Sequence, residues 1–213
     1  GCRYYPNDPF GLSGRYEGHF PTLQQGSRRY AYNVVEGSLD GRRMHLFDHH
    51  HETYSTNSKG HRTTHHHHRT FVCLEHDADL GRMEVRPEHF LDKVGGFFGF
   101  DDIDFESEEF SRKYHVKAND RKLAYDVFHP KMIEFFLSLG DFKVTTAHSL
   151  ALFRRGSGTM SIEQIERTLL DADGDVRGLI FFNEQQPQTV ARELEPTRQN
   201  VGNNPDEIRP DFG

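Results

Sequence analysis

The feature that most constrains the fold is a pair of histidine runs on either side of a turn sequence. Ten of the fifteen histidines lie between His45 and His76, mostly in the runs 49–51 and 65–68. Between these runs stands Asn57-Ser58-Lys59-Gly60, a combination of residues that favours a turn. The flanking segments 44–54 and 63–74 contain β-branched and aromatic residues and lack Pro and Gly. We therefore predict a β-hairpin that carries both histidine runs.

The register of this hairpin decides which histidines share a face. If residues 57–60 close a symmetric hairpin, the pairing of the two strands is fixed. This pairing places opposite charges and apolar side chains across from each other, which favours it over a pairing shifted by one residue. The opposed residues are His49 with His68, His51 with His66, Asp48 with Arg69, and Leu46 with Phe71.

The predicted register gives each face a candidate set of metal ligands, because side chains alternate between faces along a strand. The first set is His49, His51, His66 and His68. The second set, on the other face, is His50, Glu52, His65 and His67. Opposed Cβ atoms lie about 5 Å apart, so these imidazoles could converge on a zinc or nickel ion.

Two interpretations of the histidines stay open. Metal ligands usually come from separated elements with supporting hydrogen bonds, so a histidine run on one hairpin also suits a polar strand surface for which no cofactor is expected. In the alternative, the hairpin binds zinc or nickel. A metal-dependent hydrolase would additionally need an open coordination position and a base, for which Glu52 is the nearest candidate.

The order of the elements predicts an α+β fold, in which an antiparallel sheet has helices packed on one face. Strands come first and helices follow, which argues against a doubly wound parallel sheet. Strands are predicted at 30–37, 44–54, 63–74 and 83–86, and a second hairpin at 142–154. Helices are predicted at 87–98, 120–137 and 162–170.

The chain is predicted to hold one domain between two flanking segments. Residues 1–27 are rich in Gly, Pro and aromatic residues and are expected to be a lead-in that packs on the core. Residues 28–183 are predicted to form the single α+β domain. Residues 184–213 are rich in polar residues and are expected to be a disordered tail, because they cannot bury enough apolar surface to offset their ordering entropy.

An acidic segment, residues 100–110, interleaves carboxylates with apolar residues. Paired carboxylates can perform acid–base chemistry or hold Ca²⁺ or Mg²⁺. The alternation of Ile103 and Phe105 favours instead a strand with a solvated acidic face. Ser107 is then expected to cap a short helix whose first positions, Glu108 and Glu109, suit the positive end of the helix dipole.

Charge and composition exclude some classes of function. The net charge of -7 argues against nucleic-acid binding, which needs clustered Lys and Arg. Apolar runs in the sequence are too short to span a membrane, so the chain as given is not expected to cross a bilayer. Two isolated cysteines, Cys2 and Cys73, indicate a reducing compartment rather than a disulfide framework.

The region from about Tyr30 to Phe153 resembles a family of uncharacterised bacterial proteins. The resemblance rests on Asp102-Ile103-Asp104-Phe105-Glu106-Ser107 followed by Glu109-Phe110-Ser111-Arg112, and on the segments 47–48, 54–56, 63–68 and 124–127. Members of this family usually carry hydrophobic N-terminal segments before the domain. The resemblance implies a soluble part of a membrane-anchored protein on the cytoplasmic side of the bacterial membrane. It implies no catalytic residues, because the family has no assigned activity.

These observations predict a non-enzymatic interaction or regulatory domain of a bacterial membrane-anchored protein, with an unidentified protein partner. The candidate contact surfaces are the histidine hairpin and the acidic segment. The alternative is a metal-binding or metal-dependent hydrolytic protein that uses the histidine hairpin.

Overall fold

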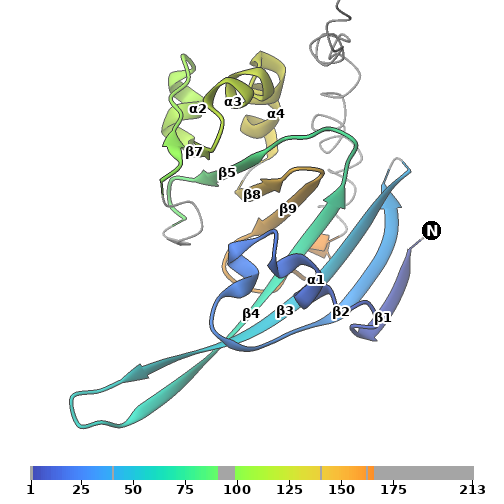
Figure 1. Cartoon of the computed structure of the whole chain (residues 1–213), viewed down its shortest axis with the longest axis vertical. Coiled ribbons are helices and arrows are strands. Elements are labelled where there is room, and N and C mark those ends of the chain that lie inside the picture. Colours follow the sequence, from blue (N-terminus) through green and yellow to red (C-terminus); the bar gives the residue numbers. More distant parts are fainter. Residues whose placement is uncertain (1, 40, 91–98, 140, 162, 166–213) are drawn as a thin grey trace, which may run out of the picture.

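The residues that the structure describes form a single nine-stranded antiparallel sheet with short helices packed against it (Figure 1). The computed structural model describes residues 2–39, 41–90, 99–139, 141–161 and 163–165. The strand order is β1-β2-β3-β4-β9-β8-β5-β7-β6, and each neighbouring pair is antiparallel. The predicted α+β class with an antiparallel sheet is therefore confirmed. The predicted tail, residues 184–213, lies outside the described residues.

The N-terminal half of the sheet is built from the lead-in, the strand that follows it and the histidine hairpin. Its strands are β1 (Arg3–Asn7), β2 (Ser27–Leu39), β3 (Arg42–Thr56) and β4 (Arg62–Glu75). Two short helices stand between β1 and β2, namely α1 (Leu12–Glu17) and the 3-10 helix η1 (Pro21–Gln24). The lead-in thus contributes an edge strand, which sequence reasoning did not predict.

The C-terminal half of the sheet carries the remaining helices. Its strands are β5 (Arg82–Pro87), β6 (Asp101–Asp102), β7 (Tyr114–Ala118), β8 (Phe142–Ala147) and β9 (Leu150–Arg155). Its helices are α2 (Glu108–Lys113), α3 (Arg121–Val127) and α4 (Pro130–Leu139). The prediction that a helix begins at Pro87 is wrong, because Pro87 ends β5 opposite Tyr114 of β7. A proline is tolerated at such a strand terminus, and most of the predicted helix, residues 91–98, lies outside the described residues.

The two faces of the sheet pack against different sets of helices. Along β3, Met44 and Leu46 belong to one core cluster, which also contains Phe110 of α2 and Phe136 of α4. The intervening Phe47 belongs to a second cluster with the lead-in side chains. Because neighbouring strand residues point to opposite faces, α2–α4 cover one face while α1 and η1 cover the other. The predicted packing of helices on one face thus holds for α2–α4, whereas α1 and η1 cover the other face.

Helix caps agree well with the sequence. The Ser107 side chain accepts a hydrogen bond from the backbone N–H of Phe110 and begins α2, as predicted. Ser161 and Gln164 form a capping box at the start of the helix predicted at 162–170, because each side chain accepts the backbone N–H of the other residue. These local signals are read correctly because they depend on residues only three positions apart.

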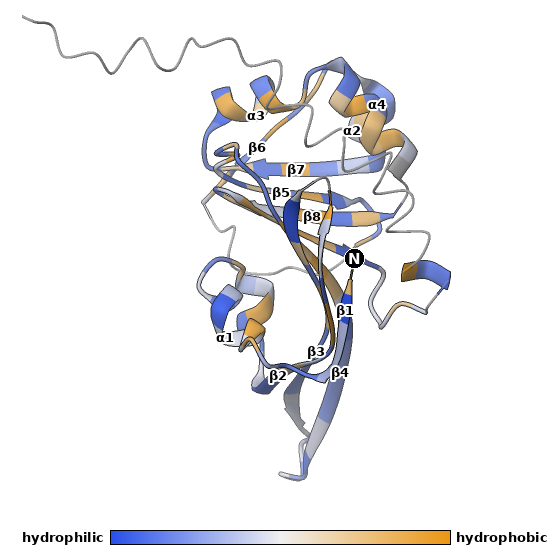
Figure 2. Ribbon diagram, turned by 90° about the vertical axis from the view of Figure 1, so that its right-hand side faces the viewer, coloured by the Kyte–Doolittle hydropathy of each residue, from blue (hydrophilic) through white to orange (hydrophobic). Residues whose placement is uncertain are grey.

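The β3–β4 hairpin extends beyond the rest of the described chain (Figure 1). β2 pairs with β3 only as far as Glu52, and β9 pairs with β4 only from Val72 to Glu75. The two strands remain paired with each other out to Thr56 and Arg62. Hydrophobic colours mark the part of the hairpin within the sheet, and hydrophilic colours prevail towards its tip (Figure 2).

Candidate functional site

The register of the histidine hairpin differs by one residue from the predicted register. The structure pairs His50 with His68 and His51 with His67, whereas the prediction paired His49 with His68. The predicted match of Asp48 with Arg69 is likewise wrong, because Arg69 lies opposite His49.

The turn explains the shift, because it contains one residue more than a symmetric 57–60 turn. The Asn57 side chain accepts hydrogen bonds from the backbone N–H groups of Lys59 and His61. Gly60 supplies the left-handed backbone that this loop needs, with φ of 80°. His61 therefore belongs to the turn, and the ladder begins with Thr56 opposite Arg62.

The shift redistributes the histidines between the faces, because opposed residues point to the same side. Both predicted ligand sets are split. One face, here called the Glu52 face, carries His50, Glu52, His66 and His68. The other, here called the His49 face, carries His49, His51, His65 and His67. The structure thus brings together half of each predicted set.

On the His49 face, two imidazoles are buried beneath the lead-in. His49 and His51 are 1% and 2% exposed. The Oγ atom of Ser13 in α1 lies 3.3 Å from Nε2 of His49. His51 stacks on His67, with ring centroids 4.7 Å apart and an interplanar angle of 14°. Stacked rings do not direct their nitrogens at a common point, so this pair is poorly arranged to chelate an ion.

Burial keeps these imidazoles neutral. It is the main cause that lowers the pKa of His49 to about 4, with smaller contributions from the proximity of His51 and Arg29. It also lowers the pKa of His51 to about 4, with Arg69 as the next cause. Among the described residues, Nδ1 of His49 and Nδ1 of His51 have no hydrogen-bond partner. His49 and His51 therefore extend the core, whereas His65 on the same face is exposed.

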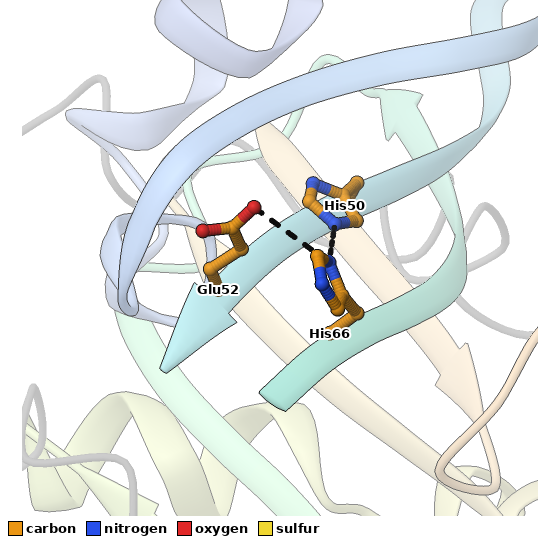
Figure 3. A group of neighbouring side chains, drawn as sticks. All are labelled: His50, Glu52 and His66. Carbon is orange, nitrogen blue, oxygen red and sulfur yellow. Dashed lines mark hydrogen bonds and ion pairs between the residues drawn. The ribbon is translucent and has the colours of Figure 1, made fainter. Parts of the chain in front are cut away.

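On the Glu52 face, three potential ligands converge (Figure 3). Nε2 of His50 lies 3.1 Å from Nδ1 of His66, which in turn lies 3.6 Å from Oε1 of Glu52. All three donor atoms lie within 4.8 Å of one another. His50 and Glu52 come from β3 and His66 from β4, so the group depends on the observed register.

Neighbouring groups fix the orientation of these side chains. Nδ1 of His50 lies 3.1 Å from the backbone oxygen of Arg28. A carbonyl only accepts, so Nδ1 carries the proton and Nε2 presents its lone pair towards His66. The Tyr54 hydroxyl donates to Oε2 of Glu52 over 2.8 Å. This hydrogen bond is the main cause that lowers the pKa of Glu52, and the Arg28 guanidinium adds to the effect.

The remaining two predicted ligands, His68 and His65, are not among these three donors, although the ring centroids of His68 and His50 lie 4.8 Å apart. His68 shares the Glu52 face, but its Nδ1 lies 2.9 Å from the hydroxyl of Tyr32. His65, on the opposite face, is exposed and lies 2.8 Å from Oγ of Ser55. Sequence reasoning missed Tyr54, although its position two residues after Glu52 places it on the same face. The sequence carries no signal for the Arg28 carbonyl.

Asp102 of the acidic segment contacts two side chains of β7. Asp102 lies 2.9 Å from Nε2 of His115 and 3.4 Å from Nζ of Lys117, both on β7. The expected extended strand is short, since β6 contains only Asp101 and Asp102. These contacts favour a role in holding β6 against β7.

A buried ion pair that sequence reasoning missed crosses the sheet between β5 and β8. Nζ of Lys143 lies 2.7 Å from Oε2 of Glu84, and both side chains are almost fully buried. Its signal in the sequence is a charged residue between apolar neighbours, such as Glu84 between Met83 and Val85. Because both charges are compensated, the pair is best explained as structural.

An open cleft of about 900 Å³ lies at the base of the hairpin beside α1. Its lining includes Arg15, Arg42 and Arg43. Arg15 lies 3.3 Å from Glu75, and Arg42 lies 3.1 Å from Asp77, so acidic side chains offset this positive charge. The cleft is a weaker candidate than the hairpin.

The fold and the site define an α+β antiparallel-sheet domain with a projecting hairpin that carries histidines. No protein-family model matches this chain, and no curated protein matches it. Among solved structures, it is similar to the crystal structure of the mycobacterial trehalose monomycolate transport factor A, TtfA, with a TM-score of 0.56. The match covers 84% of this chain and 88% of that chain, at 13% sequence identity. At this identity the likeness shows a shared fold alone. No helix within the described residues has the length and apolar character needed to span a membrane.

Proposed function

We propose that this chain is a non-enzymatic interaction domain of a membrane-anchored bacterial protein that takes part in transport, on the cytoplasmic side of the membrane. The observation that carries the proposal is the projecting β3–β4 hairpin, which offers a contact element outside the packed sheet (Figure 1). The fold shared with a mycobacterial transport factor supports the transport context. The resemblance to a family with N-terminal hydrophobic segments supports the membrane anchor. The free cysteines, Cys2 and Cys73, suit a reducing compartment.

The charge of the hairpin indicates an acidic partner. No Asp or Glu occurs between Glu52 and Glu75, whereas Lys59 and Arg62 lie exposed in this interval. The whole chain has a net charge of -7, so the hairpin is a local cationic surface on an acidic protein. Such complementarity steers association and selects partners.

The backbone of the hairpin suits an extended partner segment. Within the described residues, no strand pairs with the outer edge of β4 from Arg62 to His66, because β9 begins its pairing at Val72. An extended peptide can add to such an edge through main-chain hydrogen bonds. The proposed partner is therefore a protein with an acidic, extended segment.

The hydrolytic alternative has less support. A hydrolase would need a general base beside its metal, and Glu52 cannot act as both ligand and base. Asp48, the next carboxylate on the same face, accepts hydrogen bonds from Thr70 and Asn33. These contacts suit a structural carboxylate.

Site-specific photo-crosslinking in cells of the native host tests the docking proposal. A benzophenone amino acid replaces Thr64, which is exposed on β4, or Tyr125, which is 45% exposed on α3. We expect a discrete crosslinked protein from position 64, greatly reduced by Lys59→Glu combined with Arg62→Glu, and absent from position 125. Identical products at the two positions, or none at position 64, would contradict the proposal.

A further inference from the structure

We propose that His50, Glu52 and His66 form a binding site for one divalent transition-metal ion, with zinc as the experimental probe. This site goes beyond the proposed docking function, because docking through Lys59, Arg62 and the outer edge of β4 from Arg62 to His66 does not require a metal ion. It also differs from both ligand sets that the sequence predicted. The separate experiment below can therefore fail without affecting the docking proposal.

The distances between donor atoms are close to those of a tetrahedral site. Zinc binds imidazole nitrogen at about 2.0–2.1 Å, so two such ligands at a tetrahedral angle stand about 3.3 Å apart. The observed separation of Nε2 of His50 and Nδ1 of His66 is 3.1 Å. The separation of Nδ1 of His66 and Oε1 of Glu52 is 3.6 Å, where about 3.4 Å is expected. The third pair of donor atoms, on His50 and Glu52, lies within 4.8 Å, so side-chain movements that close this separation admit the ion.

Two of the ligands are already oriented for binding. The Arg28 carbonyl fixes the His50 tautomer, so that Nε2 is the free donor atom. The Tyr54 hydroxyl holds one Glu52 oxygen and leaves Oε1 turned towards His66. Supporting hydrogen bonds of this kind distinguish a built site from a chance group of histidines.

The site is buried on the Glu52 side and open to solvent on the His66 side. The Glu52 side chain is 6% exposed, whereas the His66 side chain is 58% exposed, so an ion can enter past His66. Nη1 of Arg28 lies 3.5 Å from Oε1 of Glu52, and the Arg28 side chain is 76% exposed. This exposed guanidinium can move into solvent when an ion takes its place beside the carboxylate.

The chemistry of the ligands indicates the class of metal. Two imidazole nitrogens and one carboxylate suit zinc, iron, cobalt or nickel, whereas calcium and magnesium prefer sites made only of oxygen. Three protein ligands leave one position for solvent in a four-coordinate ion.

Zinc titration by calorimetry tests the site, on full-chain protein without a tag and never exposed to nickel resin. We expect one zinc ion per chain with a Kd of about 1 μM or tighter. His66→Gln should weaken binding about 100-fold, while the matched control His67→Gln, on the opposite face, should change it less than about 3-fold. Thermal unfolding of each variant confirms that it is folded.

Two further variants separate this site from chance chelation by neighbouring histidines. Glu52→Gln keeps the shape of the side chain and should also weaken binding about 100-fold, whereas chelation by His66 and His68 alone would be unaffected. Tyr54→Phe should weaken binding about 10-fold through the loss of one supporting hydrogen bond. Several weakly bound ions, binding that resists Glu52→Gln, or equal losses in His66→Gln and His67→Gln would overturn the proposal.

Discussion

On the His49 face of the hairpin, the rings of His49 and His51 lie beneath the lead-in, and the Nδ1 atom of each lacks a partner among the described residues. On the Glu52 face, imidazoles of the same two strands lie beside a carboxylate and have oriented donor atoms. Neighbouring histidines in the sequence therefore enter two different environments. Because side chains alternate along a strand, a histidine run contributes imidazoles to two surfaces. The residues around each surface then determine whether its imidazoles are buried or free to bind a ligand.

The largest predicted effect on stability comes from a permanent positive charge on the His49 face, compared with the same charge on the Glu52 face. His49→Lys places a cation where burial disfavours charge and where Arg69 lies directly opposite. We expect it to lower the free energy of unfolding by about 4 kcal/mol, as measured by urea denaturation. The matched change His68→Lys, at an exposed position on the Glu52 face, should cost less than about 1 kcal/mol. Similar costs for both variants would contradict the difference between the faces.

Acid should destabilise the protein through the His49 face. Above pH 6.5, imidazoles are neutral in both states, so the stabilising effect is fully present. As the pH falls from 6.5 towards 4, the unfolded chain takes up protons while His49 and His51, with pKa values of about 4, do not. We expect a loss of up to about 3 kcal/mol from His49 by pH 4.

The control for this pH effect is His49→Gln, which has no titratable group at that position. Urea denaturation of both proteins between pH 7.5 and pH 4 measures the difference in slope. Carboxylates also titrate in this range, so the difference between the two proteins isolates His49. If the free energies of unfolding of the two proteins change in parallel with pH, the pKa of His49 is not lowered in the folded state as predicted.

A smaller effect is expected where the lead-in approaches β3. Gly26 has φ of 67°, and a Cβ atom there would overlap the backbone oxygen of Glu52 and touch the His51 ring. Gly26→Ala should therefore cost about 2 kcal/mol in thermal or urea unfolding. Gly18→Ala is the control, because a Cβ there meets nothing within 4 Å, and it should change stability by less than about 0.5 kcal/mol. Unchanged stability of Gly26→Ala would contradict the close packing of the lead-in against the His49 face.

The fold class was predictable because it depends on local signals that the structure preserves. Alternating apolar residues located the strands, and the short-range caps Ser107 and Ser161 located helix starts. The role of the lead-in was harder to predict. Burial of Tyr16 and the pairing of Arg3 with Glu36 depend on contacts between segments far apart in the sequence.

The candidate site was only partly predictable, because its register depends on one residue of the turn. The side-chain hydrogen bonds of Asn57 draw His61 into the loop, and this contribution outweighed the favourable match of Asp48 with Arg69 that the sequence offered. A shift of one residue moves every side chain of one strand to a different set of neighbours. The residue types of the candidate site were therefore foreseen, but their grouping was not.

The most direct test of the difference between the faces is a crystal structure of the zinc-loaded chain with anomalous diffraction at the zinc absorption edge. We predict one strong anomalous peak bounded by His50, Glu52 and His66, with His51 and His67 stacked on the opposite face. A peak among His49, His51 and His67, or a ladder that pairs His49 with His68, would contradict the account.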